Sequence, residues 1–168
     1  HKPVGAAPFP VVAVIAIVQH WGQSRTWWRR MTALAIFLAF VTLLRGKGLL
    51  SIPRRGVTWL VGHTEISNPP VVPRAHSGAI LLVPTRKTKQ DRHSFVTVKA
   101  GRVTALLAAH VTWLRGRPRR PRFLFPAHKR NRAKGLASWD PNSHRPITTA
   151  SLLALIRRAL REVCGLSQ

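Results

Sequence analysis

The feature that most limits what this chain can fold into is its charge. Its 168 residues include 28 Lys and Arg against 4 Asp and Glu, which gives a formal net charge of +24. A folded domain with this charge repels itself unless a polyanion neutralises it. Nucleic acid is the commonest such partner, and the release of its counterions makes the contact favourable and salt-dependent. The charge therefore predicts a nucleic-acid partner, with an anionic membrane surface as the lesser alternative.

The rest of the composition predicts one folded domain without a metal. Apolar residues make up 45% of the chain, which excludes a disordered polar tail, and the length suits one domain. Cys164 is the only cysteine, which excludes an intrachain disulfide and a cysteine-based zinc site. Four histidines match no metal-ligand or catalytic spacing, so we expect neither metal nor cofactor: His93, His110, His128 and His144.

Two apolar runs, residues 11–18 and 31–44, are each shorter than the ~18–20 residues that cross a bilayer. We expect buried helices instead, at about 10–21 and 26–44, with Gly22 ending the first and Gly46 and Gly48 ending the second. We therefore expect no membrane partner.

The middle of the chain predicts a small antiparallel sheet. Residues 57–61, 79–83 and 95–98 are rich in β-branched and apolar side chains, which favours strands. Residues 62–77 are predicted to be a loop, and the polar residues 84–93 a basic hairpin tip. Together with the helices, these strands predict an α+β fold that is mainly helical, with a three-stranded antiparallel sheet.

The last third predicts two helices joined by a basic connection. Apolar spacing favours a helix at 103–114, followed by an arginine-rich loop at 115–122, a short buried segment at 123–125 and irregular structure at 128–145. A final helix begins at the candidate N-caps Thr148 or Thr149 and ends at Gly165. The predicted parts of the single domain 1–168 are thus helices (1–45), the sheet with its basic hairpin (46–100), and helices with a basic loop (101–168).

Four short stretches in this order resemble the catalytic domain of the tyrosine recombinases, the phage-integrase family. Residues 43–50 (LLRGKGLL) resemble the stretch around the family's first catalytic arginine, and 85–88 (TRKT) resembles the hairpin that carries its catalytic lysine. Residues 123–126 (FLFP) and the final helix, with RRAL at 157–160 and CGLS at 164–167, resemble later family segments. The resemblance covers about residues 9–168.

The resemblance implies roles for specific residues in phosphodiester chemistry. Arg45 would bind nonbridging phosphate oxygens, since a guanidinium binds two at once and keeps its charge at any relevant pH. Lys87 would be the general acid that protonates the leaving 5′ oxygen, with Lys89 as the rival candidate. Further contacts with duplex DNA are expected from Arg86, Lys89, Arg92, Arg119 and Arg120. The full-length parent would form a homo-oligomer on DNA and recombine it through a 3′-phosphotyrosyl intermediate, with no small-molecule substrate.

The chain departs from the family pattern at several points. Gly48 occupies the position of a usual Glu or Asp, and the chain has no tyrosine. The family's H-x-x-R box should begin just after Gln168. We therefore expect an incomplete catalytic domain, a truncated or decayed copy that binds DNA but cannot complete strand exchange by itself. The compartment would be nuclear in a eukaryotic host and otherwise the cytoplasm or nucleoid.

Plainer interpretations remain for the same residues. Arg45 at a helix end can cap carbonyls or complement the helix dipole, and Lys87 can be one more phosphate contact among its basic neighbours. An arginine-rich chain without tyrosine also fits a degraded reading frame. The alternative function is that of a noncatalytic basic protein, an RNA- or ribosome-associated structural module with extended arms at 115–122 and 128–134.

Overall fold

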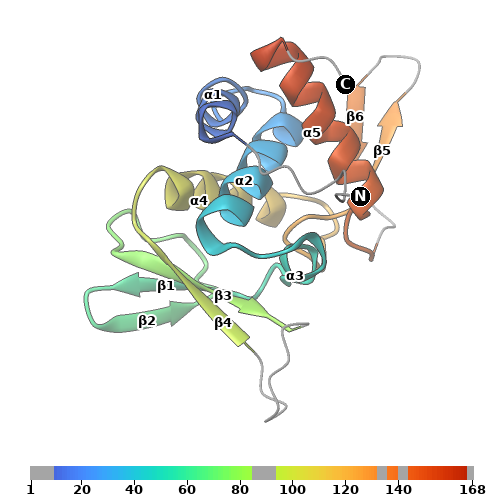
Figure 1. Cartoon of the computed structure of the whole chain (residues 1–168). Helices are drawn as coiled ribbons and strands as arrows, with labels where there is room; N and C mark the ends of the chain where they lie inside the picture. The colour runs from blue at the N-terminus through green and yellow to red at the C-terminus, as the bar shows by residue number, and fades with distance from the viewer. Residues whose placement is uncertain (1–9, 85–93, 132–135, 140–143, 166–168) are drawn as a thin grey trace.

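A computed structural model describes residues 10–84, 94–131, 136–139 and 144–165, which form a layer of helices over an antiparallel sheet (Figure 1). The helices are α1 (Val11–Trp21), α2 (Trp27–Thr42), α3 (Gly46–Leu50), α4 (Arg102–Arg115) and α5 (Thr149–Cys164). The strands are β1 (Val57–Val61), β2 (Thr64–Ser67), β3 (Gly78–Val83), β4 (Ser94–Lys99), β5 (His128–Asn131) and β6 (Leu136–Trp139). The predicted α+β class is confirmed.

The main sheet has the strand order β2-β1-β3-β4, with every neighbouring pair antiparallel. It therefore has four strands rather than the expected three, because β2 lies inside the segment 62–77 that was predicted to be a loop. Gly62, at φ 61°, reverses the chain directly after β1, so that Ile66 pairs with Trp59. β2 is an edge strand exposed over most of its length, and it lacks the apolar alternation that marks a strand in sequence.

Two further segments differ from the sequence prediction. Residues 128–145 were expected to be irregular, but β5 and β6 pair as an antiparallel hairpin within them. Gly46 and Gly48 were expected to end the second helix, but they belong to α3. It is Leu43, at φ 58°, that ends α2 in the left-handed conformation. A leucine in this conformation is uncommon, which explains why the sequence did not predict it.

The ends of α5 follow the sequence prediction. The Thr148 hydroxyl accepts a hydrogen bond from the backbone N–H of Ser151 at 3.1 Å, which caps the helix. Gly165 follows the last turn at φ 65°, where glycine has no steric penalty. The helices expected at about 10–21 and 103–114 are also present, as α1 and α4.

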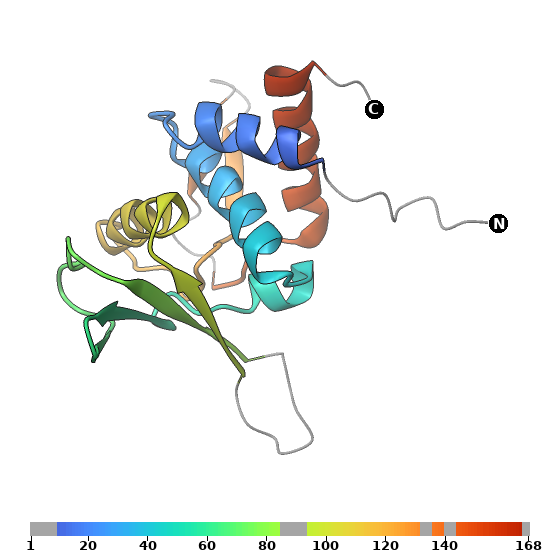
Figure 2. The same cartoon turned by 60° about the vertical axis from the view of Figure 1, so that its left-hand side comes forward.

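α2 lies between the sheet layer and the pair formed by α1 and α5 (Figure 2). One of its faces packs with α4 onto the sheet, where Leu34, Leu38, Trp59 and Leu81 are almost fully buried. Its other face forms a second cluster with α1 and α5. Among the described residues, no helix has the length and apolar content needed to cross a bilayer.

Candidate nucleic-acid interface

Arg45 lies in the short turn between α2 and α3. Leu43 ends α2 in the left-handed conformation and is 85% exposed, and the extended backbone of Arg45 then starts α3. The Arg45 side chain is exposed and makes no hydrogen bond or ion pair with the residues that the structure describes. The geometry therefore does not favour a carbonyl-capping role for Arg45, and its guanidinium is accessible to a phosphate.

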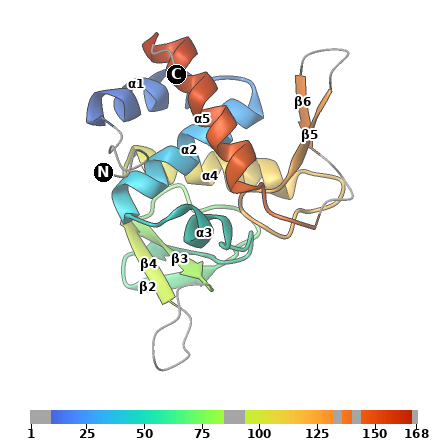
Figure 3. The same cartoon turned by 45° about the vertical axis from the view of Figure 1, so that its right-hand side comes forward.

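The base of the β3–β4 hairpin lies next to α3 (Figure 3). A Cβ atom built on Gly48 would lie 3.6 Å from Cγ1 of Val83, the last residue of β3. One turn of helix thus separates Arg45 from the root of the hairpin. The predicted contacts Arg86, Lys87, Lys89 and Arg92 fall within 85–93, outside the described residues, so the structure brings the base of their hairpin to α3 and leaves their own positions untested.

A group of arginines surrounds the turn after α3. Arg54 is half-buried, and its Nε donates to the carbonyl oxygen of Pro121 at 2.8 Å. Burial lowers the pKa of Arg54, and the positive charges of Arg55, Arg120 and Arg115 lower it further. An arginine remains charged at neutral pH despite such a shift, so these side chains concentrate positive charge around one turn. Sequence reasoning selected Arg120 here and missed Arg54 and Arg55, although the Arg54-Arg55 pair after Pro53 was visible.

Other arginines near this turn hold the fold together. Arg115 donates to the carbonyl oxygen of Pro70 and, at 3.1 Å, to Oδ1 of Asn68, which fastens the loop after β2 to α4. The Arg117 guanidinium lies 4.3 Å from the ring centroid of Trp113. Arg119 and Arg120, by contrast, are exposed. They are the residues of this loop that the sequence predicted to contact DNA, and their exposure is compatible with that role.

The FLFP segment, one of the stretches that carried the family resemblance, is buried. Leu124 and Phe125 are fully buried, and the Leu124 N–H donates to the carbonyl oxygen of Ile52 at 2.9 Å. The Nε2 of His110 donates to the Leu124 carbonyl oxygen at 2.6 Å. Burial, and secondarily the charge of Arg30, lower the pKa of His110 to about 4, although the hydrogen bond opposes the shift. His110 is thus a neutral histidine of the core, whereas the sequence suggested an ordinary surface or partly buried histidine.

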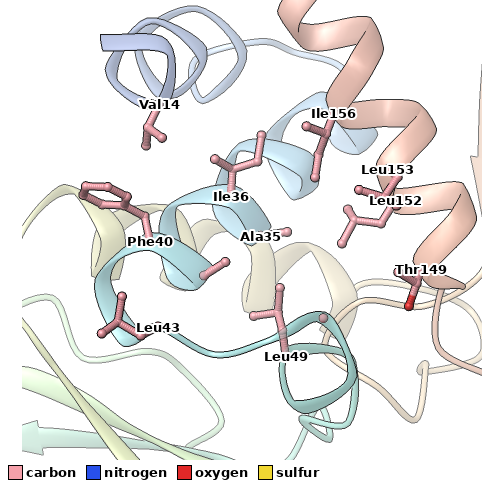
Figure 4. Close-up of a pocket in the computed structure, with 12 residues that line it drawn as sticks. Val14, Ala35, Ile36, Phe40, Leu43, Leu49, Thr149, Leu152, Leu153 and Ile156 are labelled. Atoms are coloured by element: carbon pink, nitrogen blue, oxygen red, sulfur yellow. The ribbon is translucent and has the colours of Figure 1, made fainter. Parts of the chain in front are cut away.

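An apolar cavity of about 470 Å³ lies between α1, α2, α3 and α5 (Figure 4). Phe40, Leu43, Leu49, Leu152 and Ile156 are among its lining side chains. Among its described lining residues Thr149 has the one polar side chain, so these residues offer an apolar surface and no acid–base group. Among the described residues, no group of three His, Cys, Asp or Glu side chains could hold a metal ion.

Among the described residues, the short segment around Arg45 includes no carboxylate or histidine, and its charged side chains are the exposed Arg45 and Lys47. The acidic side chains that the structure describes are Glu65, on the edge strand β2, and Glu162, which forms ion pairs with Arg29 and Arg158. The candidate site thus consists of the exposed Arg45 beside the base of the β3–β4 hairpin. A second concentration of positive charge lies at Arg54, Arg55 and Arg120.

The fold is similar to that of a solved recombinase. The XerH site-specific recombinase bound to palindromic difH substrate, in a post-cleavage complex, matches 95% of this chain with a TM-score of 0.59 and 15% identity. XerH bound to difH substrate in a pre-cleavage complex matches 93% of this chain with a TM-score of 0.55 and 18% identity. This chain spans 36% and 35% of those chains, about a third of their length.

No family model matches the sequence, and no curated protein matches it. At this level of identity, the likeness to XerH concerns the fold. The α+β fold with its four-stranded antiparallel sheet is thus similar to part of the XerH site-specific recombinase.

Proposed function

We propose that this chain binds duplex DNA as part of a tyrosine recombinase catalytic domain, through the surface that contains Arg45 and the β3–β4 hairpin. The observation that carries the proposal is the exposed Arg45 side chain, which has no partner among the described residues and lies one helical turn from the root of a basic hairpin. The similarity of the fold to XerH over nearly the whole chain also supports the proposal.

In this proposal Arg45 binds the nonbridging oxygens of the scissile phosphate and stabilises the charge that develops on them in the transition state. Lys87 protonates the leaving 5′ oxygen, with Lys89 as the rival for that role. Arg86, Lys89, Arg92, Arg119 and Arg120 contact backbone phosphates. Such contacts set the register and affinity of the complex but carry no sequence information.

The sequence has no tyrosine, so the attacking nucleophile of recombination is not among these 168 residues. What we assign to this chain is therefore DNA binding and phosphate stabilisation. Site-specific recombination through a 3′-phosphotyrosyl intermediate, in a homo-oligomer on DNA, is the activity proposed for the full-length parent.

Filter binding of a duplex DNA and an RNA of equal length, at matched salt, tests the proposal. We expect duplex DNA to bind more tightly, with an affinity that falls by about 0.9 log units per phosphate contact for each tenfold rise in salt. Tighter binding of RNA would contradict the proposal and favour an RNA-associated structural role.

A further inference from the structure

A second cationic site lies away from Arg45, in a cavity of about 320 Å³ between α5, the start of α2 and the start of β5. Residues from one side of α5 line most of it, and Trp28 and His128 complete its wall. The described lining residues are Trp28, His128, Ser151, Ala154, Leu155, Arg158 and Arg161. None of these described residues is acidic, so they have the composition of an anion site rather than a cation site.

Two nitrogen atoms of the wall are buried without a hydrogen-bond partner among the described residues. They are Nε1 of Trp28, a residue that is 4% exposed, and Nδ1 of His128. A buried polar group that lacks a partner destabilises the fold. An indole N–H can only donate, so a ligand that satisfies it must bring an acceptor oxygen.

Glu162 holds two arginines near the cavity, Arg158 and Arg29, in place. The Arg158 guanidinium lies 4.8 Å from the ring centroid of Trp28, and its Nε donates to Glu162 at 2.6 Å. Arg29 donates to the other oxygen of Glu162 at 3.1 Å, so both oxygens of this carboxylate are occupied. Glu162 thereby orients Arg158 beside the indole, and the terminal nitrogens of Arg158 have no hydrogen-bond partner among the described residues. Arg161 is exposed and forms no ion pair within the described part of the chain.

We propose that this cavity binds a phosphate group, held by Arg158 and Arg161 and by the indole N–H of Trp28. A tetrahedral oxyanion presents several acceptors at once, which suits a cavity whose lining combines donor side chains from α2 and α5. The cavity volume suits a phosphate or pyrophosphate with part of its hydration. The phosphate can come from a nucleic-acid backbone or from a free phosphate compound. The proposal is independent of the function assigned to Arg45.

Titration of the ¹⁵N-labelled protein with inorganic phosphate, at constant ionic strength against chloride, tests the cavity directly. Trp28→Phe identifies the Trp28 indole signal in the spectrum. We expect phosphate, and not chloride, to shift that signal saturably. Arg161→Gln should weaken the binding by about tenfold, which corresponds to about 1.4 kcal/mol.

Arg157→Gln is the matched control, since it removes one exposed charge from α5 at a position that does not line the cavity. The proposal is overturned if phosphate gives no saturable shift, or if Arg157→Gln weakens binding as much as Arg161→Gln, which would indicate diffuse attraction. A short DNA duplex separates the two sources of phosphate. A shift of the Trp28 signal identifies the nucleic-acid backbone, whereas DNA binding without that shift identifies a free phosphate compound.

Discussion

Two stretches that carried the same sequence resemblance differ completely in their surroundings. Within residues 123–126, Leu124 and Phe125 are fully buried in the core, where Leu124 is hydrogen-bonded to both Ile52 and His110. The turn from Leu43 to Arg45 is exposed, and the Arg45 side chain bonds to none of the described residues. A resemblance of motifs thus combines positions that maintain the fold with positions that are accessible to a ligand, and burial separates the two.

The same contrast divides the arginines on either side of α3. Arg54 donates to a backbone carbonyl and is half-buried, which makes it a structural residue that also contributes charge. Arg45 is exposed and contributes charge alone. We therefore expect substitutions at the buried contacts of His110 and Arg54 to alter the free energy of unfolding, and substitutions at Arg45 to alter DNA binding.

The largest effect is expected at His110. Its folded-state pKa is about 4 and its unfolded value 6.5, so the unfolded chain takes up the proton first as pH falls. The neutral form contributes stability that is present above about pH 6.5 and is lost as pH falls toward 4. The loss is about 3 kcal/mol for this shift.

Urea denaturation at pH 7 and pH 4 measures this loss, with His110→Gln as the comparison because an amide can still donate to the Leu124 carbonyl. Wild-type protein should lose about 3 kcal/mol more than the variant does between these pH values. Equal losses in both proteins would show that His110 is not the neutral buried group described here.

Next in size is the effect of Arg54→Met. Methionine has a similar length but no donor, so the substitution removes the bond to the Pro121 carbonyl, and we expect a loss of about 1–3 kcal/mol in the free energy of unfolding. The matched control is Arg55→Met, at an exposed neighbour, which should change stability by less than about 0.5 kcal/mol. Equal effects of the two substitutions in urea denaturation would remove the distinction between structural and surface arginines.

Part of the fold could be predicted from the sequence. Helical periodicity predicted α4 and α5 because their apolar stripes become buried, and Thr148 and Gly165 marked the ends of α5 by local chemistry. α1 was predicted from a nearly continuous apolar run, and the expectation that it is buried on most faces was wrong at Val11, Val12 and Ile15, which are exposed. β2, β5 and β6 were missed because each strand has only four residues and β2 and β5 are mostly polar. Pairing with a neighbouring strand decides whether such short segments form strands.

The candidate site was predictable only in part. Arg45 was selected by resemblance, and its exposure depends on the left-handed Leu43, which no local signal predicts. Arg54 and the cavity beside Trp28 were missed because they depend on which segments meet in space: Arg54 meets residue 121, and the cavity joins residues from 28 to 161. The roles of the hairpin residues Arg86, Lys87, Lys89 and Arg92 remain predictions.

A smaller effect is expected at Gly48, in the helix that follows Arg45. A methyl group there would make ordinary contacts, 3.5 Å from Leu44 and 3.6 Å from Val83, so Gly48→Ala should fit without strain. We expect a gain of about 0.5–1 kcal/mol, because alanine loses less backbone entropy in a helix. Gly62→Ala is the control: at φ 61° it should destabilise the protein in thermal denaturation, whereas a loss of stability from Gly48→Ala would contradict the packing described.

The smallest effect on stability, and the most direct test of the proposed function, is expected at Arg45. The measurement is duplex DNA affinity over a range of salt for Arg45→Gln and for Arg25→Gln, which removes an exposed charge before the far end of α2, about 24 Å of helix away. We predict that Arg45→Gln weakens binding about tenfold and lowers the salt slope by about 0.9, with unfolding unchanged, and that Arg25→Gln leaves both nearly as they are. Equal weakening by the two substitutions, or none by Arg45→Gln, would contradict the assignment of this surface to DNA.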